Sequence, residues 1–128
     1  MAQLTLNGEF EFKNKSVNVN LNLYLFKEDG SFIVYCPALD MSAYGDSEEH
    51  AKKSFVDVFE ISVKYMLNKN TMRDDLIHHG WQVKSMKQRR IKAPSFDKML
   101  NSNKIFREIL ENKEYTTYKE KLGIPQFA

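Results

Sequence analysis

The sequence predicts an α+β domain in which an antiparallel sheet, built from a hairpin and short strands, is packed by one long helix. The hairpin follows from residues 17–27, where aliphatic side chains occupy most alternate positions, and from the shorter segment 31–36. The helix follows from residues 47–67, where apolar side chains recur at the spacing of helical turns. No internal repeat or low-complexity linker interrupts this pattern.

A tight turn is expected between the two strands of the hairpin. Glu28-Asp29-Gly30 separates them, and glycine tolerates the positive φ that such turns need. Pro37 should end the second strand, because proline cannot donate a hydrogen bond to the ladder. Residues 41–44 are long enough for a short third strand, after which Gly45 turns the chain into the helix.

We expect the long helix to run from Ser47 to about Leu67. Asp46 is the predicted N-cap, and Glu49 completes a capping-box pattern. The polar stripe is narrow and consists of Lys53, Asp57, Glu60 and Lys64. Apolar side chains fill most of the remaining circumference, among them Ala51, Phe55, Val56, Val58, Phe59, Ile61, Val63, Met66 and Leu67. This pattern predicts a helix that is covered on more than one side.

Weaker signals precede and follow this central region. Residues 3–13 alternate weakly up to Phe10 and Phe12 and predict a half-buried edge strand. After the long helix, Thr71 and Asp74 resemble the capping box of a shorter helix. The other expected elements are a strand at 81–86, a helix at 103–112, a strand (slightly favoured over a helix) at 115–122 and a loop at 123–125.

The length and composition suit one globular domain with a small appendage. The chain has 128 residues, of which 42% are hydrophobic, and this is enough to form a core. We therefore divide it into an α+β domain at residues 1–84 and a carboxy-terminal extension at 85–128. The extension is expected to pack on the domain or to mediate oligomerisation.

Charge, cysteine content and hydropathy predict a cytoplasmic protein. The formal net charge of +2 is too small to indicate a nucleic-acid-binding or membrane-binding surface over the whole molecule. Cys36 is the only cysteine, so no internal disulfide can form and a reducing compartment is expected. The amino terminus lacks the pattern of a signal peptide, and no apolar stretch approaches the roughly 20 residues of a membrane helix.

The sequence offers no clear constellation for catalysis, metal binding or cofactor binding. A two-metal nuclease needs converging carboxylates. The candidates are Asp40, Asp46, Asp57, Asp74 and Asp75. Asp46 is already explained as a cap, and acids in the first turn of a helix are favoured by its dipole. His78 and His79 are adjacent, so they would point in different directions on a helix. We expect no catalytic residue, no metal and no cofactor.

Two surfaces have more than one interpretation. The basic cluster consists of Lys84, Lys87, Arg89, Arg90 and Lys92. It is either a solvated strand end and loop, or a patch that binds phosphate or an acidic partner. The second face of the main strand carries Asn18, Asn20, Asn22, Tyr24 and Phe26. That face is either a docking surface or is packed by the carboxy-terminal segment.

Residues 24–83 resemble the HicB antitoxin family, in which a strand hairpin is followed by a turn and then by a Gly-Asp-Ser or Gly-Asp-Thr start of an acidic helix. The motif positions found here are Pro37, Asp40, Gly45, Asp46 and Ala51. The chain differs from the family pattern at Ala38 and at Asp40-Met41, where the family usually has Asp and Pro-Gly.

The resemblance implies a partial ribonuclease H-like fold and a non-enzymatic antitoxin that binds and neutralises a small mRNA-cleaving HicA-like toxin. We also expect a homo-oligomer. Family members generally add a ribbon-helix-helix or helix-turn-helix part, but residues 85–128 match neither, so the repressor role is not carried over. DNA binding is expected to be weak because the sequence has at most five clustered cations. The alternative is a nucleic-acid-binding module that uses the Lys84–Lys92 cluster without a toxin partner. A nuclease on the same scaffold is a third hypothesis.

Overall fold

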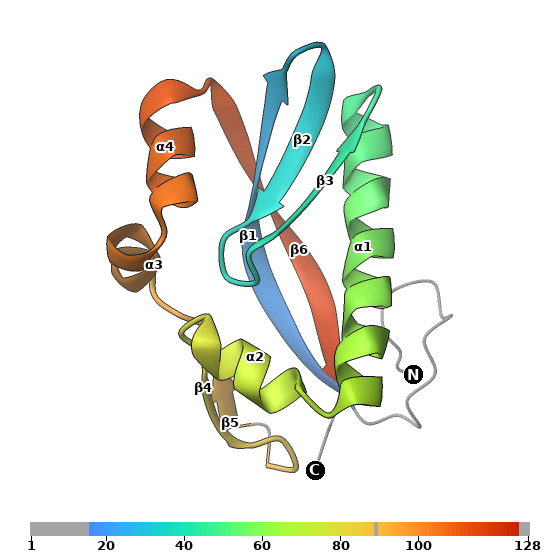
Figure 1. Ribbon diagram of the computed structural model, residues 1–128, viewed down its shortest axis with the longest axis vertical. Coiled ribbons are helices and arrows are strands. Elements are labelled where there is room, and N and C mark those ends of the chain that lie inside the picture. The colour runs from blue at the N-terminus through green and yellow to red at the C-terminus, as the bar shows by residue number, and fades with distance from the viewer. Residues whose placement is uncertain (1–15, 89, 126–128) are drawn as a thin grey trace.

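The computed structural model describes residues 16–88 and 90–125, and these form a four-stranded antiparallel sheet with helices on both faces (Figure 1). The sheet has the strand order β3-β2-β1-β6, with β1 at Ser16–Glu28, β2 at Ser31–Cys36, β3 at Met41–Gly45 and β6 at Tyr115–Pro125. The helices are α1 at Glu48–Lys69, α2 at Met72–His78, α3 at Phe96–Ser102 and α4 at Lys104–Asn112. A second, two-stranded sheet pairs β4 at Gln82–Ser85 with β5 at Arg90–Lys92. The predicted α+β class is confirmed.

The predicted hairpin is confirmed. β1 and β2 pair antiparallel, and Glu28 lies opposite Ser31 across a two-residue turn. Asp29 and Gly30 both have positive φ, 52° and 84°, which is the geometry of the tight turns that match the twist of a hairpin. β3 follows as the expected third strand and forms one edge of the sheet.

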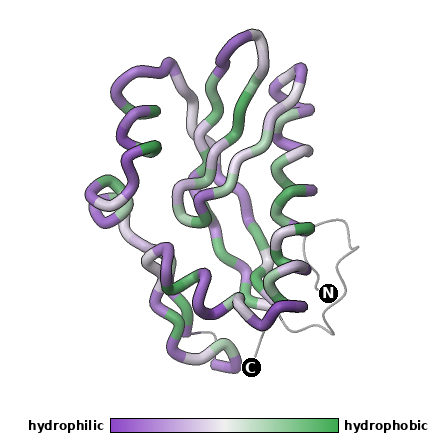
Figure 2. Tube along the Cα trace, in the orientation of Figure 1, coloured by the Kyte–Doolittle hydropathy of each residue, from purple (hydrophilic) through white to green (hydrophobic). Residues whose placement is uncertain are grey.

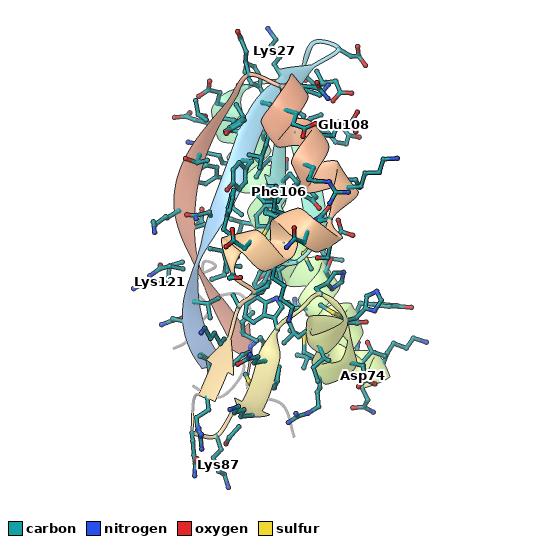
Figure 3. The ribbon with its side chains drawn as sticks, turned by 90° about the vertical axis from the view of Figure 1, so that its left-hand side faces the viewer. Lys27, Asp74, Lys87, Phe106, Glu108 and Lys121 are labelled. Carbon is teal, nitrogen blue, oxygen red and sulfur yellow. The ribbon has the colours of Figure 1, made fainter. Side chains whose placement is uncertain are left out.

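The alternation along β1 divides the core into two layers. On one face, Leu21, Leu23 and Leu25 pack in the cluster that also contains Phe55 and Phe59 of α1. On the other face, Tyr24, Phe26 and Tyr35 pack with Phe106 and Ile109 of α4. The carboxy-terminal segment therefore covers part of the second face of β1, while Asn18, Asn20 and Asn22 remain exposed. In Figure 2 the hydrophobic residues of α4 lie on the side towards the sheet, and in Figure 3 Phe106 points from α4 towards the strands.

The predicted N-cap of α1 was wrong by one residue. Ser47, in extended conformation, is the cap, and its hydroxyl oxygen accepts a hydrogen bond from the backbone N–H of His50 at 3.1 Å. The backbone N–H of Asp46 instead donates to Nδ1 of His50 at 3.1 Å, and the Asp46 side chain is exposed. Asp and Ser are similarly good caps, so the sequence Asp46-Ser47 does not determine which of the two residues is the N-cap. Thr71 is the N-cap residue of α2, as expected, but its side chain makes no capping hydrogen bond.

The expectation that α1 is covered on more than one side was also wrong. Its fully buried residues are Ala51, Phe55, Phe59 and Val63, which recur at intervals of four and form a single stripe. Ile61 and Tyr65 are 67% and 62% exposed. The apolar pattern of α1 predicted that Ile61 is buried, although no described element packs over it.

The carboxy-terminal region contains more regular structure than predicted. The expected helix at 103–112 is confirmed as α4, whereas α3 and β5 were not predicted. The expected strand at 115–122 extends to Pro125, so the expected loop at 123–125 was wrong. Pro125 lies opposite Ser16, and proline is tolerated there because β6 is an edge strand of the four-stranded sheet.

The two parts into which the sequence was divided contribute to one sheet. β6, from the carboxy-terminal extension 85–128, pairs with β1 from Ser16 to Phe26. α4 of the same extension packs against Tyr24 and Phe26. The edge strand expected at residues 3–13 lies outside the described residues, as does Arg89 of the basic cluster.

Candidate functional site

Three hollows in the surface meet at Asp40. This residue ends the turn between β2 and β3, is exposed, and has a left-handed backbone conformation with φ of 52°. The hollows have volumes of about 610, 400 and 270 Å³, and the Asp40 side chain or backbone lines each of them. An Asp at positive φ is tolerated more easily than most residues, and such positions concentrate at functional sites. Asp40 is therefore the centre of the candidate site.

A hydrogen-bond chain holds the Asp40 carboxylate. The hydroxyl of Tyr35 donates to Oδ1 of Asp40 at 2.7 Å, and Nδ2 of Asn103 donates to the Tyr35 oxygen at 2.8 Å. Asn103 is also the N-cap of α4, where its Oδ1 accepts from the backbone N–H of Phe106 at 3.0 Å. Burial raises the pKa of Tyr35 well above its ordinary value, so its hydroxyl remains protonated and can donate. The chain links the β2–β3 turn to the start of α4.

The hollow of about 400 Å³ is a groove between α1 and α2, which we call the α1–α2 groove. Its lining is Leu39, Asp40, Met41, Ile61, Ser62, Tyr65, Met66, Asp75, Leu76 and His79. The exposed side chains of Ile61 and Tyr65 stand on its α1 side. Two acidic residues, Asp40 and Asp75, lie among these apolar side chains. The groove is thus apolar with a negative component.

The hollow of about 610 Å³ lies between α2, α3 and α4 and is more basic than the α1–α2 groove. Its lining is Pro37, Asp40, Ile77, His78, His79, Gly80, Lys98, Met99, Ser102, Asn103, Lys104 and Ile105. Ile77 and Ile105 are exposed. We call Asp40 together with Ile61, Tyr65, Ile77 and Ile105 the Asp40 surface. Four exposed apolar side chains grouped around Asp40 are typical of a binding surface.

The family-motif residues separate into two groups at opposite ends of β3. Pro37 and Asp40 belong to the turn that lines the hollows. Gly45, Asp46 and Ala51 lie at the junction of β3 with α1. A Cβ on Gly45 would lie 2.6 Å from the backbone nitrogen of Ala51, so this junction requires a glycine for close packing. Gly45 and the buried Ala51 of the second group therefore have a structural role.

The basic cluster lies on the β4–β5 hairpin. Lys84, Arg90 and Lys92 line a hollow of about 230 Å³ together with Gln82 and Ile91. Lys87 lies in the turn at the tip of the hairpin, at the lower end of the molecule in Figure 3. The structure thus brings three of the five predicted basic residues together and leaves Lys87 beyond them.

The other residues considered for chemistry are separated. Asp57 and Asp74 are exposed on α1 and α2, and Asp46 lies before α1. Within residues 16–88 and 90–125, no three His, Cys, Asp or Glu side chains are grouped closely enough to hold a metal ion. His79 has its Nδ1 2.8 Å from the backbone oxygen of Asp75 in its own helical turn.

Cys36 is expected to be unreactive in the folded protein. Its side chain is fully buried, and burial raises the pKa of the thiol to about 12. Since the thiolate is the reactive form, a disulfide reagent at mildly alkaline pH should modify native Cys36 at least about a hundredfold more slowly than the urea-unfolded chain. Reaction monitored by absorbance under both conditions checks this. Similar rates would show that β2 opens readily.

The sequence did not identify several residues of the candidate site. Tyr35 and Asn103 meet across a large sequence separation, and no periodicity reports such a contact. Ile61 was assigned to the core because it fits the apolar pattern of α1. The one available signal was Asn103 directly before an amphipathic helix, which is an N-cap pattern.

None of the described helices has the length and apolar character needed to cross a membrane. The sequence matches no protein-family model, and neither a curated protein nor a solved structure shows significant similarity to the chain.

Proposed function

We propose that this protein is a non-enzymatic HicB-like antitoxin of partial ribonuclease H-like fold, which binds and neutralises a small mRNA-cleaving HicA-like toxin in the cytoplasm and forms a homo-oligomer. The observation that carries the proposal is the Asp40 surface. Ile61, Tyr65, Ile77 and Ile105 are exposed and line the hollows that meet at Asp40.

Exposed apolar side chains that cluster over hollows are the usual centre of a protein–protein interface. The Asp40 carboxylate gives such an interface a charged acceptor, held in place by Tyr35. The fitting partner segment therefore presents apolar side chains to the α1–α2 groove and an arginine or lysine to Asp40. The resemblance to HicB antitoxins supports this assignment at Pro37, which lines the hollow of about 610 Å³, whereas Asp40 lies where the chain differs from the family pattern.

Co-expression with a small toxin encoded beside this protein tests the proposal. The two proteins should co-purify, and the complex should cleave RNA much more slowly than the free toxin. The substitution Ile61→Glu should weaken the complex roughly tenfold or more, since it places a charge in the centre of the interface. Tyr44→Glu is the matched control, because Tyr44 is 72% exposed and does not line the three hollows.

If the toxin complex is as stable with Ile61→Glu as with Tyr44→Glu, the Asp40 surface is not the toxin-binding interface. Absence of any complex would remove the antitoxin function itself. In that case the alternative is a nucleic-acid-binding module that acts through the basic cluster without a toxin. The observation that favours this alternative is the grouping of Lys84, Arg90 and Lys92 on the β4–β5 hairpin.

A further inference from the structure

The outer face of the β4–β5 hairpin carries only polar and basic side chains. Along both strands, exposed residues alternate with partly buried ones. The exposed set is Gln82, Lys84, Arg90 and Lys92. The inward set includes Val83 and Ile91, which pack against the main core cluster. The hairpin therefore has one face fixed to the protein and one cationic face free for contact.

Within residues 16–88 and 90–125, no carboxylate pairs with the charges of this face, which are those of Lys84, Arg90 and Lys92. The three cations surround the hollow of about 230 Å³. A mobile anion or an anionic ligand is needed to balance them, and release of counterions would favour binding of a polyanion.

The cations are displayed from an ordered support. Nη1 of Arg73 in α2 donates to the backbone oxygen of Val83 at 3.0 Å. Nε1 of Trp81, directly before β4, donates to the backbone oxygen of Ala38 at 2.7 Å. With the inward packing of Val83 and Ile91, these bonds fix the ribbon before any ligand arrives. Binding would then require little further ordering of the backbone.

The composition of the face favours nucleic acid over protein as the ligand. Protein interfaces have an apolar centre and are poor in lysine. The hairpin face has neither an exposed apolar side chain nor a carboxylate, whereas lysine and arginine are the usual ligands of phosphate. A two-stranded ribbon also has the width that the major groove of DNA accepts. We infer that the outer face of the β4–β5 hairpin binds the phosphate backbone of a nucleic acid.

This site is separate from the Asp40 surface. The hollow of the hairpin shares no lining residue with the three hollows at Asp40. One protein could therefore hold its protein partner and a nucleic acid at the same time. The inference rests on the same three cations as the alternative function named above, and it does not depend on the antitoxin function.

Fluorescence anisotropy with a short DNA duplex, a short RNA duplex and a single strand tests the inference on the full chain. The wild type should bind at least one of them at low salt. With three phosphate contacts, the logarithm of the affinity should fall with the logarithm of salt concentration at a slope of about −3 for duplex DNA. The double substitution Lys84→Glu and Lys92→Glu should reduce the affinity at about 50 mM salt by at least about tenfold and should make the slope shallower by about 2.

Lys119→Glu with Lys121→Glu is the matched control, because both lysines are exposed on β6 and the change in formal charge is the same. It should reduce the affinity much less than the hairpin variant does. Equal losses in the two variants, or no binding by the wild type, would overturn the inference. Equal affinity for poly-glutamate would also overturn it in favour of an acidic protein ligand. Circular dichroism verifies that both variants fold.

Discussion

Replacing Gly45 with alanine is expected to destabilise the protein by about 3 kcal/mol, at the upper end of the usual cost of overpacking. The added Cβ would lie 2.6 Å from the backbone nitrogen of Ala51 and 2.8 Å from the carbonyl carbon of His50. Both atoms belong to the first turns of α1, so the helix as a whole would have to move. A flexible side chain could rotate away, but this backbone cannot.

Urea denaturation followed by circular dichroism measures this effect, and Gly30→Ala is the control. Gly30 has a positive φ of 84° but open space around its Cα. Its substitution should cost only the conformational penalty, about 1–2 kcal/mol. A loss at Gly45 that is no larger than the loss at Gly30 would contradict the close approach of β3 and α1.

Trp81→Ala is expected to destabilise the protein by about 3–5 kcal/mol. The side chain is 3% exposed and packs in the main core cluster. Its Nε1 donates to the backbone oxygen of Ala38, which lies in the turn that carries Asp40. The indole therefore fixes the Asp40 turn against α2 and β4, and its removal leaves both a cavity and an unpaired carbonyl.

Trp81→Phe separates these two effects. Phenylalanine retains most of the buried area but cannot donate to Ala38, so the expected loss is about 1–3 kcal/mol. Because Trp81 is the only tryptophan, both variants must be followed by far-ultraviolet circular dichroism instead of intrinsic indole fluorescence. If Phe and Ala at this position were equally destabilising, the hydrogen bond to Ala38 would be the dominant contribution. The expectation that the buried area of Trp81 also stabilises the protein would then be contradicted.

The elements with long, regular patterns could be predicted from the sequence. Eleven residues of alternation identified β1, and the Asp29-Gly30 turn fixed its partner β2. Two short elements could not. β5 has only three residues, too few for an alternating pattern, and α3 lacks the capping-box pattern that identified α2, which has the same length. In both cases tertiary contacts supply what the local sequence does not specify.

The candidate site was only partly accessible to the same reasoning. Asp40 was identified through the motif and Lys84, Arg90 and Lys92 through their charge. The sequence pattern of a helix does not show whether another element covers a given apolar side chain. The exposure of Ile61 and Tyr65 could therefore be learned only from the structure. The bond between Asn103 and Tyr35 joins two elements whose proximity depends on the whole topology.

The pairing of β1 with β6 has a consequence for synthesis on the ribosome. Val17 lies opposite Ile124. The edge of β1 that does not pair with β2 can therefore be paired only after nearly all of the described residues have been synthesised. Until then, the nascent chain presents an open strand edge beside Leu21, Leu23 and Leu25, which is a template for pairing with other chains. Contacts of such large sequence separation also form slowly. The nascent protein is therefore expected to be most prone to aggregation before β6 has left the exit tunnel.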